Sequence, residues 1–178
     1  MRIGRKSLLF GCHQFILHPI FVLIAWIRLY GWPRNKWIYV GILIHDWGYW
    51  FSSGYNSVFD SDFDIHTVWA YSKLLSQDRK AAEECLYHSR FLAIQRKKTP
   101  SRLCWADKMA SAIMPSWLWA LLAWLSGEGD IYRNNRKYET YRDEKISLKE
   151  WHKEYAKFIL PVVEKNGGRQ NVWSKEVL

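Results

Sequence analysis

The chain has 178 residues, a length that fits one ordinary domain or one domain with a short extension. Apolar residues make up 49% of it, which excludes a disordered tail and a collagen-like repeat. The 26 Lys and Arg outnumber the 17 Asp and Glu, and this net charge of +9 predicts affinity for anions such as nucleotides, nucleic acid or an acidic membrane surface.

Apolar residues recur mostly at helical spacing, and alternating β-branched runs are missing. A first helix is predicted over 7–30, bent at Pro19 and ended by Gly31. A second helix is predicted over 35–50, and the Ser- and Gly-containing stretch 52–57 is expected to be a loop.

Three aspartates, Asp60, Asp62 and Asp64, precede a helix that is predicted near 65–75. Capping of that helix is their favoured interpretation, because carboxylates are stabilised at a helix N-terminus. Their spacing resembles the start of an EF-hand loop, but the glycine and the glutamate that complete such a loop are absent.

The next helix is predicted over 77–91, begun by Ser76 or Asp78 and followed by a basic linker at 96–100. Ser101 is expected to cap the helix after it.

That helix continues into 109–127, a stretch without charged residues that is near the minimum length of a membrane span, about 17–25 residues. Because the stretch contains Pro115 and several serines, we favour a kinked, buried helix and expect no transmembrane span. Dense mixed charge over 128–157 predicts a solvated helical pair, and Pro161 and 167–168 indicate a loose end of the chain.

These elements predict an all-α fold of about six or seven helices. We expect a single domain over 1–178, with a helical core at about 7–126 and a charged helical extension at about 128–178.

The three cysteines are Cys12, Cys85 and Cys104. Their odd number and wide spacing argue against a disulfide scaffold and against a CxxC zinc site. The basic N-terminus resembles a signal peptide, but no small-residue cleavage site follows the apolar stretch. We therefore expect a protein of a reducing compartment, the cytoplasm.

Six polar residues stand on the apolar helices, each in a different helix except for one adjacent pair: His18, His45, Asp46, His66, His88 and Asp107. An unpaired buried carboxylate costs several kcal/mol or is forced neutral, whereas converging imidazoles and carboxylates bind divalent transition metals. Any one of these histidines could be an ordinary core residue with a satisfied hydrogen bond. The whole set predicts a metal site.

This order resembles the HD superfamily of metal-dependent phosphohydrolases, over residues 18–108. The resemblance implies an all-α core of the HD type. It implies a first metal held by His18, His45, Asp46 and Asp107, and a second held by His66 and His88 with a shared Asp46. The segments Tyr87-His88-Ser89-Arg90 and Ala106-Asp107-Lys108 are similar to the binuclear branch that hydrolyses diadenosine polyphosphates.

Two features depart from the family pattern. Many relatives carry Lys or Glu three positions after the HD aspartate, where this chain has Tyr49, so the proton-transfer group is not identified. The first histidine could also be His13, although the spacing to the HD pair favours His18.

The resemblance implies one or two divalent ions as cofactors (Fe, Mn, Co, Ni, Zn or Mg). It also implies that a metal-activated hydroxide hydrolyses phosphate ester or anhydride bonds of a nucleotide or a related small phosphorylated metabolite. Asp46 would take part in catalysis, with Asp62 or Asp64 as a general acid. Candidate phosphate-binding residues are Lys108, Arg90 and Arg102. For Arg90, as for the basic residues at 96–98, a solvated basic surface is the alternative interpretation. Tyr49, with Trp47 and Trp50 beside it, could stack on a nucleobase or belong to the core.

A different class of function fits the same charge and aromatic content. The chain could be a basic, aromatic-rich module that binds nucleic acid or an acidic membrane, with a structural or lost metal site. We favour the phosphohydrolase, because six potential ligands in the order of the family fit only the enzyme without coincidence.

Overall fold

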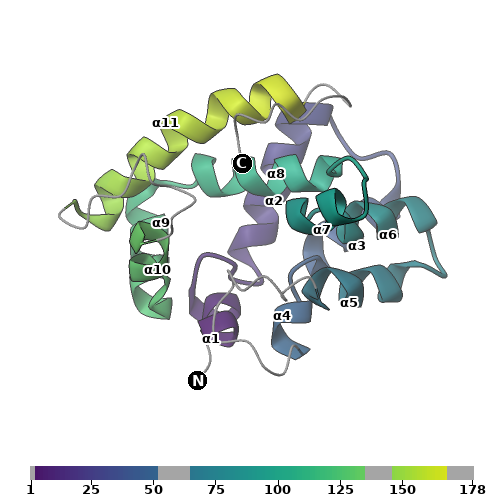
Figure 1. Cartoon of the computed structure of the whole chain (residues 1–178), viewed down its shortest axis with the longest axis horizontal. Coiled ribbons are helices and arrows are strands. Elements are labelled where there is room, and N and C mark those ends of the chain that lie inside the picture. Colours follow the sequence, from purple (N-terminus) through teal and green to yellow (C-terminus); the bar gives the residue numbers. More distant parts are fainter. Residues whose placement is uncertain (1–2, 52–64, 135–145, 168–178) are drawn as a thin grey trace.

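The computed structural model describes residues 3–51, 65–134 and 146–167, and every regular element in these three ranges is a helix (Figure 1). The prediction of an all-α fold is therefore confirmed. The helices run from α1 to α11, more than the six or seven expected, because several of the expected helices are interrupted.

The first interruption separates α1 (Ile3–Phe10) from α2 (Leu17–Tyr30), so the prediction of one helix bent at Pro19 is wrong. Pro19 lies in the first turn of α2, where backbone N–H groups have no partner within the helix and a proline removes no hydrogen bond. Gly31 ends α2 as predicted, with a φ of +77° that favours glycine.

The second expected helix is divided into α3 (Lys36–Ile44) and α4 (Gly48–Phe51). Asn35 caps α3 by accepting a hydrogen bond from the Trp37 N–H. The expected loop at 52–57 lies outside the described residues.

The interruption at 45–47 contains the adjacent His-Asp pair. These two side chains therefore project from a turn and not from a regular helix.

The predicted helix at 65–75 is α5 (Ile65–Leu74). The one predicted over 77–91 is two helices, α6 (Arg79–Leu86), which Asp78 caps, and α7 (Arg90–Gln95), which Ser89 caps. The serine cap starts a new helix and leaves 87–89 between α6 and α7.

Ser101 caps α8 (Arg102–Ile113) as predicted, and the expected kink before α9 (Ser116–Ser126) is a bend of 101°. Among the described residues no helix alone has the length and apolarity needed to cross a membrane, and α8 and α9 meet those criteria only as this bent pair.

The last two helices, α10 (Glu128–Asn134) and α11 (Leu148–Gly167), are less solvated than their mixed charge predicts. Glu128 is fully buried, and α11 buries Trp151 and Tyr155 where it packs against α8 and α9 (Figure 1). The expected loose end after Pro161 is also wrong within the described residues, since α11 passes Pro161 and ends at Gly167.

Helices α2 and α8 form the centre of the packing, and they approach each other closely where Ala25, Ala106 and Ala110 are fully buried (Figure 1).

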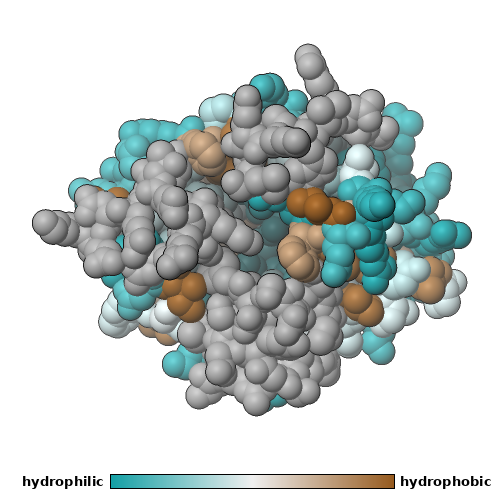
Figure 2. All heavy atoms as spheres, viewed as in Figure 1, coloured by the Kyte–Doolittle hydropathy of each residue, from teal (hydrophilic) through white to brown (hydrophobic). Residues whose placement is uncertain are grey.

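The three cysteines are free and buried, as expected without a disulfide scaffold. On the face seen in Figure 2, apolar residues are scattered among hydrophilic ones. The cytoplasmic location stays a prediction.

Candidate metal centre

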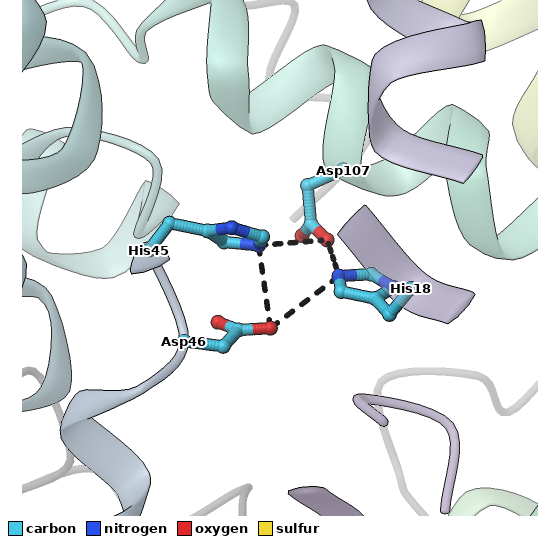
Figure 3. Close-up of side chains that lie close together, drawn as sticks. All are labelled: His18, His45, Asp46 and Asp107. Carbon is cyan, nitrogen blue, oxygen red and sulfur yellow. Dashed lines mark ion pairs between the residues drawn. The ribbon is translucent and has the colours of Figure 1, made fainter. Parts of the chain in front are cut away.

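The first group of ligand side chains comes from three separate segments (Figure 3). His18 lies in the first turn of α2, His45 and Asp46 lie in the turn after α3, and Asp107 lies in the middle of α8. The Nε2 atom of His18 is 3.3 Å from Asp46 Oδ2 and 2.9 Å from Asp107 Oδ1. The Nε2 atom of His45 is 3.3 Å and 3.8 Å from the same two oxygens.

The ring of His45 is oriented by the backbone. Its Nδ1 atom is 2.8 Å from the carbonyl oxygen of Ile42. Because a carbonyl oxygen only accepts hydrogen bonds, Nδ1 carries the proton, and a neutral ring presents the lone pair of Nε2 to the two carboxylates. Lone pairs that face carboxylate oxygens require a proton or a metal ion between them.

The second group uses the other oxygen of Asp46. His66 is the second residue of α5, and His88 lies between α6 and α7. The Nε2 atom of His88 is 3.5 Å from Asp46 Oδ1 and 3.2 Å from His66 Nε2. His88 is oriented as His45 is, with Nδ1 2.6 Å from the carbonyl oxygen of Cys85.

The two groups can each hold a metal ion. Within each, the potential ligand atoms lie within 4.8 Å of one another, and Asp46 belongs to both. Three of these buried ligand atoms have no hydrogen-bond partner: His18 Nε2, His45 Nε2 and Asp46 Oδ2. Unsatisfied buried polar atoms are costly, and a divalent cation with imidazole and carboxylate ligands would satisfy all three.

The two buried carboxylates of the cluster favour a positive charge beside them. Burial raises the pKa of Asp46 and Asp107, but their histidine neighbours outweigh burial and hold both pKa values well below the ordinary range. Burial lowers the pKa of His45, but the adjacent carboxylates of Asp46 and Asp107 outweigh burial and raise this pKa to about 10. Protons supply this positive charge when no metal is bound.

The four side chains of the first group differ in exposure. The side chains of His18, His45 and Asp46 are at most 7% exposed, whereas that of Asp107 is 27% exposed. Asp107 is therefore the member of the group that lies nearest to solvent.

Tyr49 and Gly48 pack directly against the second group. The ring of Tyr49 is buried and stacks on the ring of His66, with centroids 4.1 Å apart and planes 14° apart. A Cβ atom on Gly48 would lie 2.6 Å from the backbone carbon of His66, so only glycine permits this approach of α4 to α5. Tyr49 thus supports a ligand ring with one of its faces.

The predicted phosphate-binding residues have different surroundings. Arg90 is the first residue of α7, two positions after the ligand His88, and Lys108 follows Asp107; both are partly buried. Arg102 lies elsewhere, because its guanidinium is 2.8 Å from Glu84 Oε1 and stacks over the ring of Trp26. Asp62 and Asp64, the candidate general acids, lie outside the described residues, as does Asp60.

His13, the alternative first ligand, is not part of either group. Its Nδ1 atom is 2.9 Å from Ser7 Oγ and 3.4 Å from Glu128 Oε1. Burial lowers the pKa of His13, but the hydrogen bond and the charge of Glu128 raise it to about 9. His18 is therefore the histidine that the fold brings to Asp46 and Asp107.

Sequence reasoning missed Glu128, which lies 121 residues after Ser7 and is fully buried. It accepts hydrogen bonds from Ser7 Oγ at 2.7 Å and from the Cys12 N–H at 3.0 Å. A glutamate between two glycines at the start of a charged stretch is typical of a surface turn, so no local pattern indicated this role.

Comparisons with known proteins returned no match to a family model, to a curated protein or to a solved structure.

Proposed function

We propose that this protein is a divalent-metal-dependent phosphohydrolase of the HD type, acting on a nucleotide or a related small phosphorylated metabolite. The observation that carries the proposal is the single buried carboxylate of Asp46, whose two oxygens face two different histidine sets. Two ions that share one carboxylate suit attack on a phosphorus atom, where charge develops on several oxygens.

A divalent ion at each group would lower the pKa of its water and neutralise phosphate oxygens. The chain's own residues would hold these ions in fixed positions. The carbonyl oxygens of Ile42 and Cys85 keep the Nε2 atoms of His45 and His88 directed into the cluster, a form of support that raises ligand basicity. A substrate would approach these ions beside Asp107, the most exposed of the four side chains in the first group.

Arg90 and Lys108 are the basic side chains that we propose for phosphate binding. Lys108 directly follows the ligand Asp107, Arg90 lies two positions after the ligand His88, and neither side chain is fully exposed. The ion pair with Glu84 makes Arg102 a poorer candidate for this role.

The test combines metal analysis with a substrate screen. Purified protein is expected to contain, or to take up, one or two equivalents of Mn²⁺, Co²⁺, Fe, Ni or Zn. We expect it to release phosphate or a nucleotide from a panel of nucleoside monophosphates, deoxynucleoside triphosphates, dinucleoside polyphosphates and cyclic nucleotides. A folded protein that binds none of these metals would contradict the proposal. The variant that tests the site is Asp46→Ala, which removes the shared carboxylate. Its control is Asp130→Ala, which removes an exposed carboxylate outside the site.

A second candidate function is docking to an acidic membrane surface, favoured by the outward face of α9. Trp117, Leu121 and Trp124 repeat at helical spacing and are 61%, 44% and 69% exposed on a helix without charged residues, in a chain of net charge +9. Co-sedimentation with phosphatidylserine vesicles tests it. Loss of binding in a Trp117→Ser, Trp124→Ser variant, but not in Trp32→Ser, would support docking through α9.

A further inference from the structure

We propose that the outward face of α2 docks onto the surface of a membrane that contains anionic lipids. The proposal concerns binding and does not depend on the proposed reaction. The surface is distinct from the outward face of α9, and different variants test the two faces.

The outward face of α2 carries a stripe of isoleucines. Ile16, Ile20 and Ile24 follow one another at a spacing of four residues, which places them on one side of a helix, and they are 54%, 49% and 48% exposed. Ile20 and Ile24 each lie two positions, about 200° around the helix, from the fully buried Val22. The stripe is therefore opposite the face of α2 that packs in the core, where α8 is its main neighbour.

The stripe belongs to a helix that is apolar on both faces. Arg28, in the last turn, is the only Lys, Arg, Asp or Glu of α2. Single exposed apolar residues are ordinary on protein surfaces, but a helix that is apolar all round is normally covered on every side. Phe10 and Phe15 add two exposed rings near the start of the stripe, where the Phe15 N–H donates to the carbonyl oxygen of Leu8 in α1. This face of α2 therefore lacks the cover that its composition requires.

The charge of the surrounding segment indicates what kind of cover fits. Residues 1–45 contain six Lys or Arg and no Asp or Glu, and all 17 acidic residues come after them. Arg28 is paired with Glu164 at 2.8 Å. Arg5, Arg34 and Lys36 are exposed and form no ion pair with any residue that the structure describes. Basic side chains of this kind are attracted to the negative surface of a membrane.

The same charge favours lipid over a second copy of the chain. A symmetric dimer through α2 would bring two basic segments together, and like charges across an interface are unfavourable. A bilayer offers negative headgroups to Arg34 and Lys36 and acyl chains to the isoleucines. Because α2 has 14 residues, about 21 Å, and keeps one face packed on the protein, it would lie in the plane of the membrane surface.

The inward face of the same helix carries the candidate metal ligand His18. In the docked protein the first ligand group would lie about one helix diameter, roughly 10–12 Å, from the lipid. If the proposed reaction takes place, it would then take place at a membrane surface.

Co-sedimentation of the full chain with phosphatidylcholine vesicles, prepared with and without phosphatidylserine, tests the surface. We expect wild type to bind the vesicles that contain phosphatidylserine and to bind the others more weakly. The double variant Ile20→Gln, Ile24→Gln should lower binding about tenfold or more, because two half-exposed isoleucines no longer enter the acyl region. Its matched control is Leu75→Gln, Ile94→Gln, which changes two side chains that are 43% and 46% exposed on other elements. The control should bind as wild type does.

A second double variant, Arg34→Gln, Lys36→Gln, leaves the stripe intact and tests the surface if the isoleucine variant does not fold. It should weaken binding to phosphatidylserine vesicles about fivefold for each charge removed, and it should change binding to phosphatidylcholine alone much less. Far-UV circular dichroism and metal content should match the wild type in all three double variants, because none of these residues belongs to a ligand group.

Three results would overturn the proposal. The first is a wild type that does not bind phosphatidylserine vesicles. The second is a folded Ile20→Gln, Ile24→Gln variant that binds as wild type does, while Trp117→Ser, Trp124→Ser loses binding, which would place the membrane at α9. The third is a wild-type dimer that Ile20→Gln, Ile24→Gln makes monomeric, which would assign the face to a second copy. A failed substrate screen would count against the proposed reaction and not against this surface.

Discussion

The Nε2 atoms of His66 and His88 lie 3.2 Å apart although 22 residues separate them in the chain. The His88 ring donates from Nδ1 to a backbone carbonyl, so its Nε2 presents a lone pair toward His66 when the ring is neutral. His66 satisfies this lone pair when it carries its proton on Nε2 and donates it, and a cation bound by both rings would satisfy it in the other tautomer; Asp46 Oδ1 is the carboxylate beside them.

The first prediction is that His66→Ala or His88→Ala leaves about one metal ion per chain and greatly slows turnover. Changing His18 or Asp107 should disturb both ions, because the shared Asp46 loses its first partner. Elemental analysis of the four variants beside the wild type gives the metal content. Unchanged metal content in both His66→Ala and His88→Ala would mean a single-metal site in which these histidines contact substrate.

Asp46→Ala is predicted to remove both ions and to lower phosphohydrolase activity below a tenth of the wild-type rate. Loss of a residue that only supports a metal ligand lowers metal affinity or activity about 10–100-fold, and loss of a ligand shared by two ions should lower them at least as much. The helical fold should persist, because the core depends on apolar residues such as Val22, Met109 and Trp119. Far-UV circular dichroism and a phosphate-release assay measure the two effects. Activity retained above a tenth would refute the assignment of Asp46.

Gly48→Ala is predicted to destabilise the protein by about 1–3 kcal/mol and to lower occupancy of the second metal group, because the new Cβ overlaps the His66 backbone. Thermal unfolding and elemental analysis report the two effects. The control is Gly129→Ala, whose Cβ would first meet the side chain of Leu148, which can move aside. Equal effects of the two variants on metal content would argue against a specific role of Gly48.

The His13–Glu128 pair predicts a pH dependence of stability. The pKa of His13 is raised from 6.5 to about 9, so its stabilisation is complete below pH 6.5 and is lost as the pH rises through about 9. The pKa of Glu128 is lowered from 4.5, because its bonds to His13 outweigh burial, so its stabilisation is lost as the pH falls below 4.5.

Metal-stripped wild type should therefore exceed Glu128→Gln in thermal stability most clearly between pH 4.5 and 6.5, and the difference should shrink between pH 6.5 and about 9. Thermal midpoints across this range measure it, with exposed Asp130→Asn as the control. If the difference in thermal midpoint between wild type and Glu128→Gln stays constant from pH 6.5 to about 9, His13 is not charged beside Glu128.

How much of the site was predictable can be seen from its residues. The order of histidines and aspartates on apolar helices was enough to name all six members of the two ligand groups. The helix interruptions at 11–16, 45–47 and 87–89 were not predicted, because apolar spacing continues across them. They depend on caps such as Ser89 and on packing between distant helices.

The order of residues along the chain was sufficient to predict the helical class and the six side chains that could hold a metal, because buried imidazole and carboxylate groups that converge on one point are suited to binding a cation. Only the tertiary structure decided between His13 and His18, and it did so through Glu128, a residue far along the chain. The pairing of Arg102 with Glu84 came from the tertiary structure alone, and the tertiary structure also places Asp46 in both groups, as the resemblance implies. Such long-range pairings depend on which helix ends meet in space, and local periodicity carries no information about that.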